Sequence, residues 1–437
     1  MELNSDFSRR KFIKVSAAST LGLMASGNFA YAGGGDTIRV GLVGCGGRGT
    51  GAARDAVESS EGVEIVAMGD LFEDRLDTSM KNLKEAVGDA FKVDADHAFV
   101  GFDNYKGVIA SDADMIILAT PPGFRPLHFR AAIEAGKHVF MEKPVSVDVA
   151  GAVDIMAAGD LATQKGLSVV AGTLYRRQPS FMEAVKRIHD GMIGDIVAAQ
   201  EYYMTGPIWL RKRKSGMSDM EWQCRNWYYF TWLSGDHIVE QFVHNLDVIN
   251  WVFQAHPESA VAMGGRIERV DPSYGHIYDH FSVEYMYPQD VIVEAKCRQI
   301  NGATTRVTNR VVGTQGVAEL HPRYSMLKSH NGEVLYEMSE PGNNAYVQEH
   351  TDLIAAIRAG VPINEARQIA ESTLTAVLGR ESAYTGQMLT WAELMESRLD
   401  IVPKDFVFGS LPIPEVPVPG RTKLVRSPMK EATASAG

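Results

Sequence analysis

One stretch decides the fold: Ile38-Arg39-Val40-Gly41-Leu42-Val43-Gly44-Cys45-Gly46-Gly47-Arg48-Gly49. Its first half is an apolar, β-branched run that is typical of a buried parallel strand. The second half matches G-x-G-x-x-G: Gly44 permits a tight turn, Gly46 lets the backbone approach a pyrophosphate, and Gly49 lets a helix pack against the strand. The N-terminus of that helix offers free N–H groups to phosphates, so Gly47 and Arg48 are also expected to face the ligand. We therefore predict a dinucleotide-binding loop.

Beyond this loop the sequence alternates between strands and helices. Strands are expected at Val63–Met68, weakly near Phe99, at Met115–Ala119 and at His138–Met141, with alanine-rich helical patterns between them. This alternation predicts an α/β fold with a doubly wound parallel sheet. Ligands bind at the carboxyl ends of such strands, where Thr120-Pro121-Pro122 and Glu142-Lys143-Pro144 follow. Lys143 is therefore expected to point into the reaction space.

Asp70 ends the second predicted strand, about 20 residues after the glycines. A carboxylate at this place accepts hydrogen bonds from the adenosine ribose hydroxyls and repels a 2′-phosphate. The next residue is Leu71, so NAD is favoured over NADP, although Arg75 keeps NADP open. An alternative role for Asp70 is to cap a helix that begins near Glu73.

The composition is that of a folded, acidic chain. Its 437 residues exceed one ordinary core, so two domains plus appendages are expected. The formal net charge of -11 argues against a nucleic-acid partner, because phosphate binding needs a basic surface. Three cysteines exclude a disulfide scaffold, and no uninterrupted apolar run is long enough for a permanent membrane span.

Both ends of the chain differ from the rest. Residues 8–14 read Ser-Arg-Arg-Lys-Phe-Ile-Lys, and a weakly apolar stretch leads from them to Ala30-Tyr31-Ala32. This pattern predicts a signal peptide over residues 1–32, similar to twin-arginine export signals, and hence a periplasmic or exported protein. A basic helix that begins the fold is the alternative. The proline-rich tail, residues 401–437, is expected to be extended, either as an arm on a neighbouring subunit or as a disordered end.

The motifs together resemble the Gfo/Idh/MocA oxidoreductase family. The resemblance covers roughly residues 37–395 and rests on the glycine loop, Thr120-Pro121-Pro122, His128, Ala135–Val139 with Glu142-Lys143-Pro144, Gly172 with Arg176 and Pro179, and Tyr384-Thr385-Gly386. It implies a nucleotide-binding domain (37–155) and a C-terminal domain (156–400) with a large open, mostly antiparallel sheet. The far face of that sheet is expected to form homo-oligomers. Strands are accordingly predicted at Ile196–Tyr203, Ala260–Ile267, His280–Tyr287, Val291–Ile300 and Arg306–Val312.

The resemblance also implies roles for individual residues. The residues expected to bind the cofactor are Thr120, Pro121, His128, Glu142 and Lys143. Lys143 is also expected to assist proton transfer at a carbohydrate or polyol hydroxyl; a lysine that only pairs with Glu142 or bonds the cofactor ribose is the alternative. The family's second signature is kept as Glu240, His244 and Asp247, with glutamate where the family has aspartate. At i, i+4 and i+7 these side chains share one helix face. His244 is the expected base, and Glu240 is expected to orient it or to bind a sugar hydroxyl.

Other residues are expected to line the substrate pocket: Tyr175, Arg176, Trp227, His237 and Asp247. A metal held by the histidines and acids of this region is an alternative, which we do not favour. The tryptophan-rich stretch between Glu201 and His237 is either a lid that stacks on a sugar or a subunit-interface loop. Its basic run, Arg211-Lys212-Arg213-Lys214, either supplies cations for an anionic group or is a solvated charge run, and we favour the second.

These observations lead to three hypotheses. The first is an exported sugar or polyol oxidoreductase that holds NAD tightly, because free cofactor is not expected outside the cytoplasm. The second is an NAD-dependent glycosidase that acts by transient oxidation and elimination. The third is a non-catalytic sugar-binding member of the fold, since fold alone does not specify function.

Overall fold

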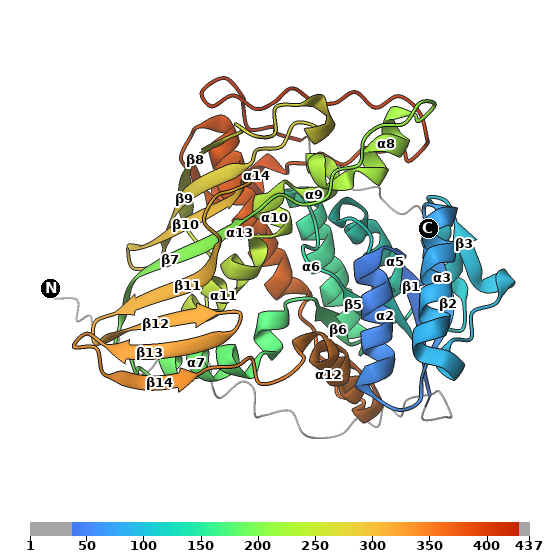
Figure 1. The fold of residues 1–437 in the computed structure, drawn as a ribbon, viewed down its shortest axis with the longest axis horizontal. Helices are drawn as coiled ribbons and strands as arrows, with labels where there is room; N and C mark the ends of the chain where they lie inside the picture. Colours follow the sequence, from blue (N-terminus) through green and yellow to red (C-terminus); the bar gives the residue numbers. More distant parts are fainter. Residues whose placement is uncertain (1–36, 428–437) are drawn as a thin grey trace, which may run out of the picture. The chain divides into compact units, whose positions relative to one another are not determined.

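The computed structural model describes residues 37–427 (Figure 1). The predicted export signal and the last ten residues of the tail lie outside this part of the chain.

A parallel sheet forms the nucleotide-binding domain, as predicted. Its order is β3-β2-β1-β4-β5-β6, made of β1 (Ile38–Val43), β2 (Val63–Asp70), β3 (Ala98–Val100), β4 (Met115–Leu118), β5 (His138–Met141) and β6 (Val169–Ala171). The central strands are buried because helices cover both faces, which explains their continuous apolar runs. These helices are α2 (Gly47–Ser59), α3 (Glu73–Val87), α4 (Asn104–Ala110), α5 (Arg125–Glu134) and α6 (Val149–Gln164).

The parallel sheet continues past residue 155, where the sequence predicts that the first domain ends. Residue 155 lies inside α6, and β6 then pairs with β5 from Val139↔Val169 onward. The expectation failed here because β6 is only three residues long and carries no mark that separates it from a strand of the second domain.

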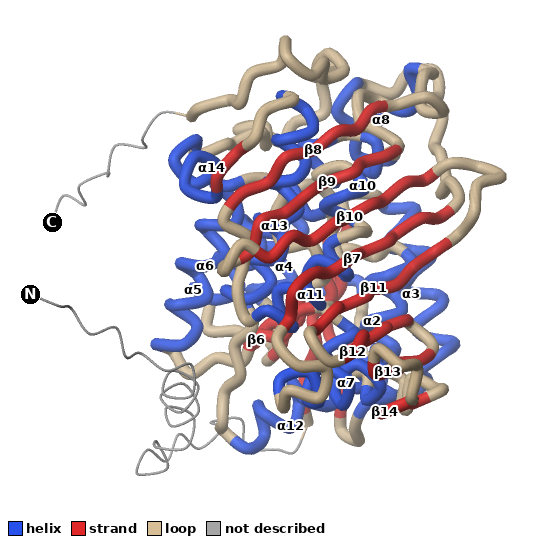
Figure 2. The backbone as a smooth tube through the Cα atoms, turned by 90° about the vertical axis from the view of Figure 1, so that its left-hand side faces the viewer, coloured by secondary structure: helices blue, strands red, loops and turns tan. Residues whose placement is uncertain are grey.

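The second sheet is a nine-stranded one in the order β14-β13-β12-β11-β7-β10-β9-β8-β15. Its strands are β7 (Ile196–Thr205), β8 (Ser259–Gly265), β9 (His280–Tyr287), β10 (Val291–Gln299), β11 (Arg306–Gly313), β12 (Gly316–His321), β13 (Tyr324–Ser329), β14 (Val334–Met338) and β15 (Leu389–Thr390). Of the described strand pairs in this second sheet, only β7 and β10 are parallel, so the sheet is mostly antiparallel, as expected. Burial alternates along β9 and β10, because one face meets helices and the other does not (Figure 2).

The helices against this sheet include α7 (Pro179–His189), α11 (Val243–Phe253) and the long, almost fully buried α13 (Ala366–Thr385). α13 also contacts α6 and β6, so the two domains share one hydrophobic core. The remaining helices are α8 (Asp219–Arg225), α9 (Thr231–Ser234), α10 (His237–Glu240), α12 (Ala345–Ala359) and α14 (Trp391–Ser397). Within residues 37–427, none of the helices has the length and apolarity that crossing a bilayer requires.

The described part of the tail is extended, as predicted, and it packs on its own chain. Gly420 donates its N–H to the carbonyl of Thr385 (2.7 Å), and Ser427 donates to that of Ser397 (2.8 Å). Phe406 and Phe408 insert among aromatic rings of the nucleotide-binding domain. Residues 401–427 are therefore an intramolecular element, and the sequence alone did not distinguish this from an arm on a neighbour.

Candidate active site

A cavity of about 530 Å³ lies over the glycine loop at the carboxyl ends of the parallel strands. At Gly44, φ is +98° and an added Cβ would lie 2.6 Å from the backbone nitrogen of Thr120. At Gly49 a Cβ would lie 1.9 Å from the carbonyl oxygen of Gly44, so the helix packs there only without a side chain. Around Gly46 and Gly47, by contrast, a Cβ would meet nothing within 4 Å, so bare backbone faces the cavity. These features fit a dinucleotide.

Two polar groups beside the loop support this fit. Asp70 accepts hydrogen bonds from the backbone N–H groups of Cys45 (2.7 Å) and Phe72 (2.9 Å), and it lines the cavity. It does not cap α3, whose N-cap is Phe72, so the alternative role is wrong. Burial raises the pKa of Asp70 above its usual value. Asn104 also lines the cavity, and its buried Oδ1 has no partner among the described residues. The sequence carried no signal for Asn104.

Arg48 and Glu142, both predicted to bind the cofactor, form an ion pair with each other. Arg48 also lies 3.5 Å from Asp55, and its guanidinium stacks over Tyr346 of α12 at 4.6 Å from the ring centroid. Arg48 still lines the cavity. The pair thus connects the start of α2 to the end of β5, and it fixes the backbone just before Lys143.

Thr120, Pro121 and His128 lie together on the cavity wall, as the motif suggested. His128 Nδ1 lies 3.3 Å from Thr120 Oγ1, and burial lowers the pKa of His128 to about 3. Its ring is therefore neutral. Arg125, which sequence reasoning missed, is fully buried and donates to the carbonyls of Leu118, Thr120 and Pro144. It holds the end of β4 against the Glu-Lys-Pro segment.

Lys143 and Glu240 meet between the two domains. The Lys143 ammonium donates to the main-chain carbonyl of Glu240 (2.6 Å) and to its carboxylate (3.2 Å). Both side chains are about nine-tenths buried, at 11% and 10% exposed. The two hydrogen bonds to Glu240 orient the ammonium, and the buried charges of the two side chains compensate each other.

The single helix predicted through Glu240, His244 and Asp247 is wrong. α10 ends at Glu240, and α11 begins at Val243. The carbonyl of Glu240 would accept the N–H of His244 in a continuous helix. In the structure the Glu240 carbonyl accepts a hydrogen bond from the Lys143 ammonium, and the N–H of His244 donates to the carbonyl of Gln241 instead, at 3.4 Å. A long-range contact that the sequence does not reveal therefore interrupts the helix.

His244 is near the lysine, at the start of α11. Burial and the neighbouring charge of Lys143 hold the pKa of His244 well below its usual value, so the ring is neutral and able to accept a proton. The ring of Tyr175 lies 5.5 Å from it, between centroids. Tyr203, which sequence reasoning did not single out, donates to Gln241 at 2.8 Å. Lys143, His244, Glu240 and Tyr175 thus come together.

Arg176 and Asp247, by contrast, bind each other. The guanidinium contacts both carboxylate oxygens, at 2.7 and 3.0 Å, and Ser372 donates to the same carboxylate at 2.8 Å. Arg176 lines a different cavity of about 560 Å³, together with Trp251. We expected Arg176 and Asp247 to face the substrate. In the structure they instead neutralise each other in a bidentate ion pair.

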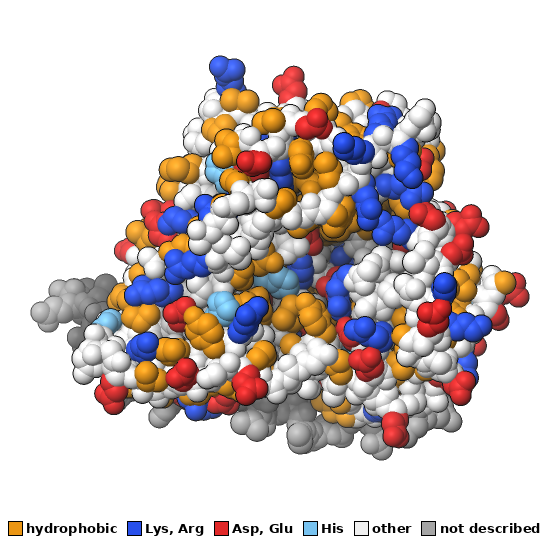
Figure 3. Space-filling view, viewed as in Figure 1, with side chains coloured by type: hydrophobic (Ala, Val, Ile, Leu, Met, Phe, Trp, Pro, Cys, Tyr) orange, Lys and Arg blue, Asp and Glu red, His pale blue; other side chains and the backbone are white. Residues whose placement is uncertain are grey.

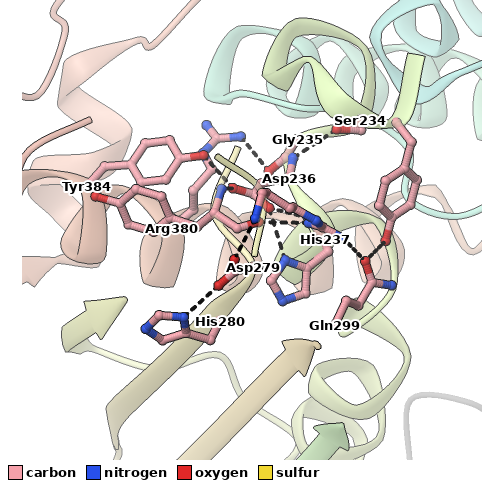
Figure 4. Close-up of polar contacts among 12 residues, drawn as sticks. Ser234, Gly235, Asp236, His237, Asp279, His280, Gln299, Arg380 and Tyr384 are labelled. Carbon is pink, nitrogen blue, oxygen red and sulfur yellow. Dashed lines mark hydrogen bonds and ion pairs between the residues drawn. The ribbon is translucent and has the colours of Figure 1, made fainter. Parts of the chain in front are cut away.

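His237 is fully buried and packs against Phe281 of β9, with ring centroids 5.2 Å apart. Its Nδ1 lies 3.1 Å from Asp236, which has a strained φ of +73° and also accepts from Tyr278 (2.8 Å) and Tyr384 (2.5 Å) (Figure 4). Burial opposes ionisation of Asp236, yet the contacts from His237 and Tyr384 hold its pKa below the usual value. The predicted substrate contact of His237 is therefore replaced by a structural one, which sets the start of α10.

The side chains of the alternative metal site do not converge. Among residues 37–427, no group of three or more His, Cys, Asp or Glu side chains is placed to hold a metal ion.

Trp227 also lies elsewhere than expected. It lines the cavity over the glycine loop, together with Trp209, Arg211 and Arg225. The tryptophan-rich segment therefore faces the nucleotide site, whereas the sequence suggested a substrate lid or an interface. Periodicity and composition did not reveal which domain this segment would contact.

Comparisons with known proteins agree with this architecture. The family model described as an oxidoreductase family with an NAD-binding Rossmann fold matches residues 38–172, and the model of the GFO/IDH/MocA C-terminal domain matches residues 181–319. A solved levoglucosan dehydrogenase in complex with NADH and levoglucosan superposes with a TM-score of 0.65 at 16% identity, over 81% of this chain and 99% of that one.

Two curated relatives show the range of the likeness. An inositol 2-dehydrogenase from Acidothermus cellulolyticus is 23% identical over 68% of this chain and 76% of its own length. A glycosyl hydrolase family 109 protein from Shewanella sp. (strain ANA-3) is 28% identical over 48% of this chain and 50% of its own length. With both domain models matched in order, the chain belongs to the Gfo/Idh/MocA oxidoreductase family.

Proposed function

We propose that this protein is an exported oxidoreductase that transfers hydride between a tightly held NAD and a hydroxyl or keto carbon of a carbohydrate or polyol. One observation carries the proposal: Lys143, held by Glu240, lies near the neutral ring of His244. Lys143 directly follows Glu142, which is paired with Arg48 on the wall of the cavity over the glycine loop. Inositol 2-dehydrogenase and levoglucosan dehydrogenase are among the similar proteins, which supports this substrate class.

The chain's own residues then divide the work. NAD, when bound, supplies the hydride acceptor. Neutral His244 accepts the hydroxyl proton, because its depressed pKa leaves a ring nitrogen free to take it. Lys143 donates a hydrogen bond to the same oxygen, and Glu240 holds the ammonium in place. Tyr175 closes one side of the histidine ring.

NAD rather than NADP follows from Asp70, a carboxylate at the edge of the loop that disfavours a 2′-phosphate. Tight retention follows from the export proposal, which rests on the twin arginines of residues 1–32. Free nicotinamide cofactor is not expected in the periplasm, so an exported enzyme keeps its own.

The test is spectroscopic. We expect the purified protein to release nucleotide on denaturation, and its absorbance near the reduced-nicotinamide band to change when the right sugar or polyol is added. Lys143→Ala and His244→Ala are expected to keep the nucleotide and to lose turnover by about 100-fold or more. Arg323→Gln, on an exposed turn of the second sheet, is the matched control. A protein without nucleotide, or unchanged turnover in both variants, contradicts the proposal.

A second candidate is an NAD-dependent glycosidase, supported by the similarity to a glycosyl hydrolase family 109 protein. Such an enzyme needs the same hydride acceptor and proton-handling groups, because the sugar is oxidised only transiently. Release of nitrophenol from nitrophenyl glycosides without added NAD would favour this candidate over net oxidation.

The outer face of the nine-stranded sheet is the proposed homo-oligomer interface. Val261, Met263 and Ile292 are exposed there on β8 and β10, at 44%, 73% and 39%. Exposed apolar side chains on one sheet face are typical of subunit contacts. Sedimentation of wild type and of Met263→Glu tests this: an unchanged mass in both, equal to one chain, contradicts it.

A further inference from the structure

The segment after β7, residues 206–230, lies against the nucleotide-binding domain. We call it the strap. Four of its side chains line the cavity over the glycine loop: Trp209, Arg211, Arg225 and Trp227. Lys and Arg side chains gather over the α8 region, next to a hollow in the surface (Figure 3). The strap is therefore positioned to touch whatever the glycine loop binds.

Arg225 attaches the strap to the residues that follow Asp70. Its guanidinium lies 3.8 Å from the centroid of the Phe72 ring and 3.1 Å from Asp74. Glu221, one turn earlier in α8, lies 3.1 Å from the same guanidinium and orients it. A cation over an aromatic ring, together with an ion pair, fixes the strap beside the adenosine side of a Rossmann site.

The tail contacts both the nucleotide-binding domain and the strap, and its contacts with the domain are aromatic. Phe406 lies 5.9 Å from Phe102 and 5.0 Å from Phe124, between ring centroids, and Phe408 lies 4.9 Å from Phe102. Both Phe102 and Phe124 line the cavity.

Hydrogen bonds continue this contact along α8. Gln223 donates to the carbonyl of Leu411 (2.6 Å), the N–H of Leu411 donates to Asp219 (3.1 Å), and the N–H of Met220 donates to the carbonyl of Gly409 (3.1 Å). Residues 406–411 are thus wedged between the strap and the nucleotide-binding domain.

Charge on the strap is complementary to a dinucleotide. A cleft of about 1000 Å³ is lined by Gly46 and Gly47 of the loop and by a set of cations that includes Arg75, Arg211, Lys212 and Lys214. Within residues 37–427 none of these four cations has an ion-pair partner. The basic run is therefore more than a solvated charge run, because unpaired cations beside the glycine loop attract an anionic diphosphate.

We propose that Trp209, Arg211, Arg225 and Trp227 belong to the nucleotide-binding site, and that residues 406–411 hold the strap closed over it, so that the dinucleotide dissociates only when strap and tail separate. This inference rests on the proposed function, since it assumes that NAD binds at the glycine loop. It accounts for retention within a single chain.

The test is the rate constant of nucleotide dissociation from the full-length protein. Protein loaded with reduced NAD is mixed with excess oxidised NAD, and the loss of bound-cofactor fluorescence is followed. We expect the double variant Phe406→Ala/Phe408→Ala to release nucleotide at least about 10-fold faster than wild type. Arg211→Gln, an exposed position whose change leaves the core intact, is expected to release it faster and to reduce the salt dependence of release. Arg323→Gln is the control.

Each outcome decides something. If both Phe406→Ala/Phe408→Ala and Arg211→Gln release nucleotide at the wild-type rate, the proposed closure of the strap over the nucleotide is wrong, while the proposed function stands. Wild type that releases no nucleotide on denaturation and also binds no NAD in calorimetry overturns the proposed function, and with it the proposed closure of the strap. If the double variant fails to fold, judged by circular dichroism, Arg211→Gln alone decides.

Discussion

The Lys143 ammonium contacts Glu240 twice, at the carboxylate (3.2 Å) and at the main-chain carbonyl (2.6 Å). The first contact orients the lysine, and the second ends α10 and begins the turn that carries His244. One side chain of the nucleotide-binding domain therefore determines the backbone of the second domain at the site. The two domains are in direct contact at this point.

Replacing Glu240 tests that relationship. Glu240→Gln keeps the shape but removes the negative charge beside the ammonium, so the charge-assisted hydrogen bond that orients Lys143 is weakened. We expect kcat to fall by about 10- to 100-fold, with little change in NAD affinity. Steady-state kinetics and NAD titration measure this. Glu240→Asp is expected to recover part of the rate, and Glu319→Gln, on β12 of the second sheet, is the control. An unchanged kcat in Glu240→Gln would contradict the positioning role.

The glycine loop makes a second prediction. In Gly49→Ala the new methyl group would lie 1.9 Å from the carbonyl of Gly44, and backbone cannot move aside cheaply. We expect loss of NAD binding and a free energy of unfolding lower by about 2 kcal/mol or more. Gly51→Ala, two residues later in the same helix, meets only Arg48 at 3.5 Å and should stabilise by up to about 1 kcal/mol. Calorimetric NAD titration and urea unfolding distinguish the two; equal behaviour would contradict the loop geometry.

Features that depend on local spacing could be predicted from the sequence, and features that depend on contacts between distant residues could not. Gly44 to Gly49 and the strand alternation predicted the parallel sheet, because local spacing encodes both. β6 was placed outside the first domain because nothing in its three residues indicates which sheet they join. The break at Glu240, the Arg176–Asp247 pair and the burial of His237 all depend on contacts between residues far apart in the chain. The position of Trp209 and Trp227 on the wall of the cavity over the glycine loop is a long-range contact of the same kind.

Asp70 makes a prediction about cofactor choice. In Asp70→Asn one oxygen still accepts a backbone N–H, but the charge that repels a 2′-phosphate is lost. We expect NAD to bind about 10-fold more weakly and the preference for NAD over NADP to shrink, helped by the unpaired Arg75 nearby. Fluorescence titration with both reduced cofactors measures the ratio. Glu319→Gln, on β12 of the second sheet, serves as control. An unchanged NAD-to-NADP ratio in Asp70→Asn would show that Asp70 does not read the ribose.

Glu201 predicts a pH-dependent stability that is separate from catalysis. It lies in the middle of β7, fully buried, and neither carboxylate oxygen has a partner among the described residues. Burial raises its pKa well above the usual value, so the folded state binds the proton more tightly than the unfolded one. The stability that this provides is complete below the ordinary carboxyl pKa and is lost as pH rises through the raised value.

Glu201→Gln replaces the carboxyl group with an amide of the same size that does not ionise. We therefore expect wild type to lose stability between pH 5 and pH 9 more steeply than the variant, by about 1–3 kcal/mol over the range. Urea unfolding at several pH values measures the slope. Glu319→Gln, a partly exposed carboxylate on β12 that accepts from Tyr324, should leave the slope as in wild type. Parallel curves for wild type and Glu201→Gln would mean that Glu201 is ionised in the core, with its charge stabilised there by water or an ion.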